Sequence, residues 1–197
     1  ENAAFLPDHG SVALAHLILG GFGFMGLLAL GFSHILIPMF ALASAPPKRA
    51  SYAGFATASI AVLLGALGAL AGNRDLLTLA LLAGLAAAAM HLWLMQRVLE
   101  SGMRKRLGLS FILVRAAWAM LPATLLAGLA ALYGVAGRNG GTLFGFLLLF
   151  GWLLTFLVAI LQRIMPFLAS MFAPPQAAGS PAIVSVLANA RSLLLHA

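Results

Sequence analysis

Five ionisable side chains lie inside long apolar stretches of the chain, where a charge costs about 2.5–3.5 kcal/mol on insertion scales. They are the histidines His16, His34 and His91 and the arginines Arg115 and Arg163. All four acidic residues of the chain lie outside these stretches. Because membrane-embedded charges are retained mainly for function, these five residues are the candidates for cofactor binding.

The chemistry that these residue types support is metal and haem binding. Imidazole binds haem iron and copper, and guanidinium groups pair with carboxylates such as haem propionates. His34, His91, Arg115 and Arg163 lie at similar depths, ~10–20 Å from one end of their stretches, and we expect them to form a shared polar layer. His16 and His34 are 18 residues apart. In an α-helix they would share a face but lie ~27 Å apart, too far to bind one metal ion together.

Other interpretations of these residues remain open. A copper ion would also use thioether sulfur, which Met90 and Met95 offer beside His91. Without a cofactor, the histidines would form hydrogen bonds between helices, and the arginines would extend to the lipid headgroups. Hydrolysis by a Ser–His–Asp arrangement and proton pumping are disfavoured, because no carboxylate lies within the apolar stretches.

The elements that carry these residues are predicted membrane-spanning helices. Of the 197 residues, 63% are hydrophobic and 8% are charged, which disfavours a soluble domain and a nucleic-acid-binding module. A spanning helix needs about 20 mostly apolar residues. The chain has five such stretches, at Ser11–Ala45, Ser51–Gly72, Leu76–Arg97, Leu109–Tyr133 and Thr142–Ala173. The sequence therefore predicts an all-α, polytopic transmembrane bundle of five helices, or six if the C-terminal segment also spans.

The distribution of basic residues predicts the orientation of the bundle. The net charge is +7, and the chain has no cysteine and so no disulfide. Two basic residues fall on one side, Arg74 and Arg138, and the remainder of the loop and tail residues fall on the other: Lys48, Arg49, Arg97, Arg104, Lys105, Arg106 and, with five spans, Arg191. Basic loops remain in the cytoplasm. We therefore expect a bacterial-type inner membrane protein with its N-terminus outside and its C-terminus inside.

The first and fifth stretches repeat one another at an offset of 128 residues. Phe22-Gly23-Phe24 corresponds to Phe150-Gly151-Trp152, and Leu36-Ile37-Pro38 corresponds to Ile164-Met165-Pro166. Both stretches would cross in the same direction. The pattern predicts a parallel internal repeat with a period of four helices and a kink at each proline.

The segment from His16 through Phe22-Gly23-Phe24 to Gly31 and Pro38 resembles a helix of the haem–copper oxidase and nitric oxide reductase catalytic subunits. Its pattern is most similar to the NnrS-type haem- and copper-binding membrane proteins. The resemblance implies a haem b ligand at His16, with copper as a second cofactor, and a role in redox or nitric oxide chemistry. His34 and His91 would add a ligand set on the inner side. Whether such a protein is an enzyme stays open.

Residues 1–197 are expected to form a single transmembrane domain, either whole or as a portion of a longer chain. Residues 180–197 would form an amphipathic helix or the start of a truncated sixth span. The expected partners are membrane lipids, other membrane subunits or further copies of the chain, and not nucleic acid. The alternative function is a non-catalytic membrane subunit or a carrier for a small anion or a lipid, in which the arginines would attract the negative group.

Overall fold

A computed structural model describes residues 8–103 and 108–172, and these residues form an all-helical bundle with five helices long and apolar enough to cross a membrane. Both the fold class and the number of spans predicted from the sequence are confirmed within this part of the chain. The predicted helix at 180–197 lies outside the described residues. The first span consists of α1 (His9–Leu17), the π-helical η2 (Ile18–Gly26) and α2 (Leu27–Ala41).

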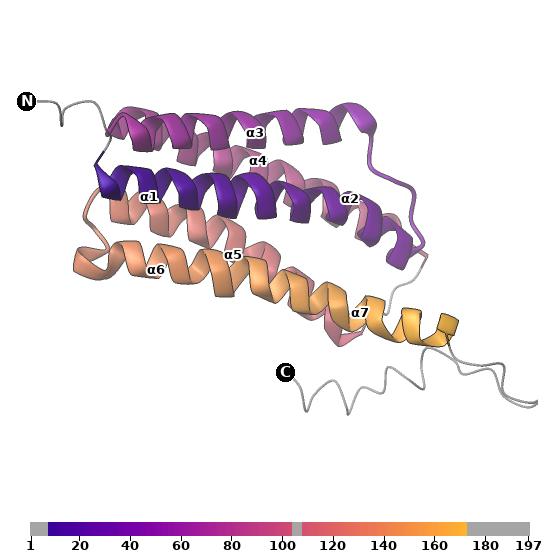
Figure 1. Ribbon diagram of the computed structural model, residues 1–197. Helices are drawn as coiled ribbons and strands as arrows, with labels where there is room; N and C mark the ends of the chain where they lie inside the picture. Colours follow the sequence, from indigo (N-terminus) through magenta and orange to yellow (C-terminus); the bar gives the residue numbers. More distant parts are fainter. Residues whose placement is uncertain (1–7, 104–107, 173–197) are drawn as a thin grey trace, which may run out of the picture.

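The next three spans are continuous α-helices, and the fifth is divided like the first. They are α3 (Lys48–Leu70), α4 (Arg74–Ser101) and α5 (Leu109–Leu132), followed after the short η3 (Gly137–Asn139) by α6 (Gly140–Phe146), the π-helical η4 (Leu147–Leu154) and α7 (Thr155–Phe172). Figure 1 shows the spans running side by side, with the first and fifth pointing in the same direction.

Local sequence signals explain where the helices begin and end. The Asp8 carboxylate caps α1 by accepting the N–H of Gly10 at 2.8 Å. The Asn73 side chain caps α4 in the same way and accepts the N–H groups of two residues. At the end of α2, Leu42 adopts a left-handed conformation with φ 52°, which turns the chain out of the helix.

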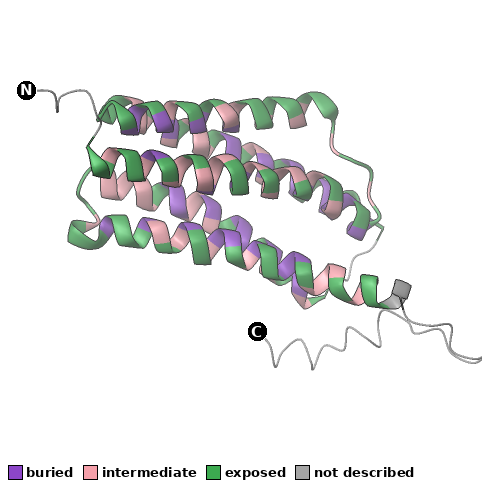
Figure 2. Ribbon diagram, viewed as in Figure 1, coloured by how far each residue is buried: buried purple, intermediate pink, exposed green. Residues whose placement is uncertain are grey.

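The surface of the bundle is apolar, as the lipid interior requires. Large side chains such as Phe24 and Ile35 are 69% and 66% exposed. Figure 2 shows exposed residues along the outer sides of the spans, with buried positions on the sides that face one another. Small residues let the helices approach closely: a Cβ added to Gly68 on α3 would lie 2.9 Å from the backbone nitrogen of Leu77 on α4.

The two π-helical segments occupy equivalent positions in the predicted repeat. An offset of 128 residues carries η2 onto 146–154, and η4 covers Leu147–Leu154. Each segment contains the aromatic-Gly-aromatic motif, and each is followed by a helix with an internal proline, Pro38 in α2 and Pro166 in α7. The correspondence therefore extends from sequence motifs to an uncommon backbone conformation, which supports the parallel repeat.

The prediction that His16 and His34 share a helix face is wrong. His16 is exposed on the surface of α1, whereas the half-buried His34 on α2 packs against a neighbouring span. The cause is η2, because a π-helix has about 4.4 residues per turn instead of 3.6, and nine such residues rotate the following helix by roughly 160°. Equal spacing in turns of α-helix therefore does not place the two imidazoles on one side.

Candidate functional site

Two of the predicted site residues meet at the interface of the first and third spans. The imidazole rings of His34 on α2 and His91 on α4 have centroids 5.3 Å apart and an interplanar angle of 53°. His91 is only 4% exposed. The indole of Trp118 on α5 meets the His91 ring edge-on at a centroid distance of 6.1 Å. Three spans thus contribute to one polar cluster, which we call the histidine pair with Trp118.

The hydrogen-bonding state of the cluster leaves its nitrogens available. His34 Nδ1 lies 2.8 Å from the Leu30 carbonyl oxygen, so its N–H donates to that oxygen and the lone pair is on Nε2. In the described part of the chain, His34 Nε2, both ring nitrogens of His91 and Trp118 Nε1 are buried without a hydrogen-bond partner. A metal-binding histidine commonly anchors its other N–H on a backbone carbonyl in the manner of His34.

The separation of the two rings is compatible with a shared metal ion. An imidazole nitrogen binds a transition metal at about 2.0–2.1 Å, which puts the ring centre about 3 Å from the ion. Two imidazoles on one ion therefore have centroids about 4.5–6.5 Å apart, with the larger values for ligands on opposite sides. The observed 5.3 Å corresponds to an angular arrangement. The angle suits a copper-type site, to which the fully buried Met95, one turn from His91, offers thioether sulfur.

A haem does not fit between these two histidines. Ligands on opposite faces of a porphyrin would be at the upper end of that range, and here the rings contact one another. Haem propionates also need cations. Arg115 is exposed on α5, and the Arg163 guanidinium lies 5.4 Å from the centre of the Phe40 ring. The structure therefore joins His34 with His91 but places neither arginine in the cluster with them.

The remaining predicted ligand, His16, lies apart from the pair by ~27 Å along the first span. Its side chain is exposed on the outer surface of α1. Within residues 8–103 and 108–172, no group of three or more His, Cys, Asp or Glu side chains is arranged to hold a metal ion. A metal on the histidine pair would therefore depend on thioether, backbone or exogenous ligands besides the two imidazoles.

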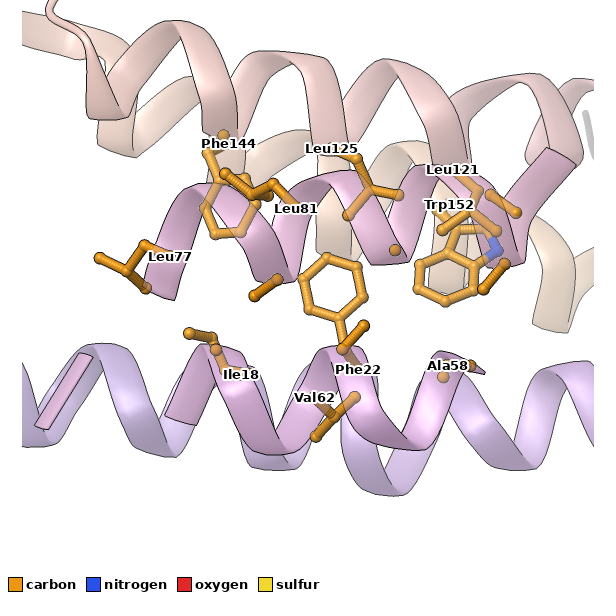
Figure 3. Close-up of a pocket in the computed structure, with 18 of the residues that line it drawn as sticks. Ile18, Phe22, Ala58, Val62, Leu77, Leu81, Leu121, Leu125, Phe144 and Trp152 are labelled. Carbon is orange, nitrogen blue, oxygen red and sulfur yellow. The ribbon is translucent and has the colours of Figure 1, made fainter. Parts of the chain in front are cut away.

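An apolar cavity of about 350 Å³ lies between the spans above the histidine pair. Its walls are entirely Ala, Gly, Val, Leu, Ile, Phe and Trp side chains from all five spans. In Figure 3, Phe22 projects across the cavity from one wall toward Leu81 and Leu125 on the other. The innermost lining residues on α2, α4 and α5 precede His34, His91 and Trp118 by about one turn, so the cluster lies just beyond the inner end of the cavity.

Sequence reasoning missed Trp118 and the cavity. A tryptophan inside a span carries an N–H that needs a partner, so the fourth span did contain a signal for the cluster. The small residues that line the cavity, including Ala61 and Gly84, also pack helices in ordinary bundles, so their types alone do not reveal an open space.

No family model, curated protein or solved structure matches this chain in the comparisons with known proteins.

Proposed function

We propose that this multi-pass membrane protein binds copper at His34 and His91 and serves in redox or nitric oxide chemistry. The observation that carries the proposal is a pair of imidazoles from different spans, 5.3 Å apart, with three ring nitrogens buried and unpartnered. Each such group costs about 1–3 kcal/mol when it is left unsatisfied. A bound ion would relieve that penalty. The resemblance of the first span to haem- and copper-binding proteins supports the same chemistry.

The chain's own residues would define the site. The Leu30 carbonyl fixes the tautomer of His34, so that Nε2 faces the partner ring as a lone-pair donor. Trp118 covers one edge of the His91 ring, and the apolar cavity excludes water from the outer side. When bound, copper would supply one-electron chemistry in a dry environment. His91 has no second partner, and it is therefore free to reorient between oxidation states.

Haem b is a separate part of the proposal, and it concerns His16. A haem on this residue would lie against the exposed surface of the first span, apart from the histidine pair. Its second axial ligand and its cations would come from residues outside the described ranges or from a partner chain. The two cofactors would therefore load independently of one another.

The orientation and location also belong to this proposal. The first span begins, and the second ends, at the end of the bundle that carries Arg74 and Arg138, whereas Lys48, Arg49 and Arg97 lie at the opposite end. The larger number of basic residues at the second end supports an N-terminus outside the cell in a bacterial-type inner membrane.

Metal analysis and optical spectroscopy of the purified full chain test the function. We expect about one copper per chain, retained in His16→Leu and lost in His91→Leu. A Soret band, if haem b is present, should disappear in His16→Leu and persist in His91→Leu. Equal copper content in all three proteins would refute the histidine pair as the site. Absence of both chromophore and copper would favour the alternative, a non-catalytic membrane subunit or a carrier for a small anion or a lipid.

A further inference from the structure

The shape of the apolar cavity limits what it could hold. Along α4 it extends from Leu77 near the outer end to Ala88, a distance of ~16 Å. With a volume of about 350 Å³, this length corresponds to a mean cross-section of about 22 Å². Such a space is long and narrow, and it has the width of a single hydrocarbon chain rather than that of a ring system.

The chemistry of the walls agrees with this shape. None of the lining side chains carries a polar group apart from the indole of Trp152, so the cavity offers water no set of partners and favours an apolar occupant. Acyl chains surround the bundle in a membrane. The cavity reaches the outer end of the bundle, where its lining includes Leu14, Leu132 and the exposed Gly141.

Polar and cationic residues lie beside this outer end. Thr78 and Tyr133 follow the lining residues Leu77 and Leu132, and their hydroxyl groups lie 3.0 Å apart in a hydrogen bond. Two exposed arginines flank the same end: Arg74 precedes Leu77 by three residues, and Arg138 precedes Gly141 by three. An apolar slot beneath hydroxyl groups and cations matches a lipid with an anionic headgroup.

We propose that the cavity binds one acyl chain of an anionic phospholipid, whose phosphate lies at Arg74 and Arg138. The chain end reaches the neighbourhood of Ala88, one helical turn from His91. The lipid closes the space above the histidine pair and excludes water from it. This inference needs only the membrane-spanning bundle, and it holds whether or not the histidines bind copper.

Photolabelling of the full chain in vesicles tests the proposal. The vesicles contain phosphatidylcholine and phosphatidylglycerol, with a trace of phosphatidylglycerol carrying a diazirine at the end of one acyl chain. We expect the label on residues that line the inner end of the cavity, such as Ala88, and competition by excess phosphatidylglycerol but not by phosphatidylcholine. Labelling confined to exposed residues such as Leu63 would overturn the site.

A cavity-filling variant provides the matched test. Ala61 lines the cavity on α3, whereas Ala56 is exposed on the same helix. Ala61→Leu adds three carbons to the cavity, and each displaced methylene changes affinity about fourfold, so cavity labelling should fall by more than about tenfold. Ala56→Leu should leave it unchanged. Equal labelling of the two variants would overturn the proposal.

The headgroup assignment has its own variant. In Arg74→Gln combined with Arg138→Gln, labelling of the cavity should lose its preference for phosphatidylglycerol, and a retained preference would overturn the assignment. Copper content, measured on the same preparations, should not change in any of these variants. Failure of the lipid proposal is therefore distinguishable from failure of the copper proposal.

Discussion

Replacing His91 by leucine should stabilise the metal-free protein, although His91 is among the most buried polar residues that the structure describes. The side chain is 4% exposed, and neither ring nitrogen has a hydrogen-bond partner in the described part of the chain. Two unsatisfied groups cost about 1–3 kcal/mol each. Leucine has a similar volume and no polar atoms, so it removes both penalties.

The gain is partly offset by the lost contact with Trp118. An edge-on aromatic pair contributes about 0.5–1.5 kcal/mol, so the net stabilisation should be about 1–4 kcal/mol. His34→Leu is the matched comparison, because it removes one unpartnered nitrogen but also deletes the hydrogen bond to the Leu30 carbonyl. Its net effect should be close to zero. The ranking of the two variants is thus set by their different hydrogen-bond states.

Thermal unfolding in detergent, after removal of metal with a chelator, measures this effect. For a chain of this size, each kcal/mol shifts Tm by about 2–4 °C, so His91→Leu should unfold several degrees above the unsubstituted protein. With copper added, the order should reverse, because a bound ligand stabilises only a protein that can bind it. A lower Tm for metal-free His91→Leu would refute the reasoning and show that the His91 nitrogens are satisfied, for example by buried water.

Two further predictions concern the first span. A Cβ on Gly26 would lie 2.9 Å from the Trp152 indole, so Gly26→Ala should lower stability by about 1–3 kcal/mol in the same unfolding assay, whereas Gly20→Ala, which meets no atom within 4 Å, should not. The pKa of the Asp8 carboxyl lies below its ordinary value of 3.8 because it accepts the Gly10 N–H, so its stabilisation of α1 is present at neutral pH and is lost as the pH falls through the lowered pKa. Hydrogen exchange at Gly10 should therefore accelerate in acid and in Asp8→Ala, and a rate unchanged by Asp8→Ala would contradict the capping role.

Apolar run length predicted the spans well because length and hydrophobicity are what a bilayer selects. The fourth span was expected at Leu109–Tyr133 and occupies Leu109–Leu132, and the second was expected at Ser51–Gly72 and occupies Lys48–Leu70. The depth argument also brought His34 and His91 together correctly, since depth follows from residue count along each helix.

Rotation about the helix axis could not be predicted in the same way. In a span that is apolar on every side, no polar face marks which residues point inward, and nothing in the composition of η2 distinguishes it from an α-helix. The outward direction of Arg115 and the position of Arg163 beside Phe40 depend on the same rotation. Depth is therefore readable from the sequence, whereas the direction of a side chain requires the packed bundle.

The π-helical segments give each repeat a means of adjusting direction without changing depth. Deleting one residue from η2 would tighten its turns toward an α-helix and rotate α2 by about 100° relative to α1. Such a deletion would swing His34 away from His91 while shortening the span by only ~1.5 Å. Homologous chains that differ by one residue in this segment would thus keep the same membrane topology and yet direct their in-span histidines to different neighbours.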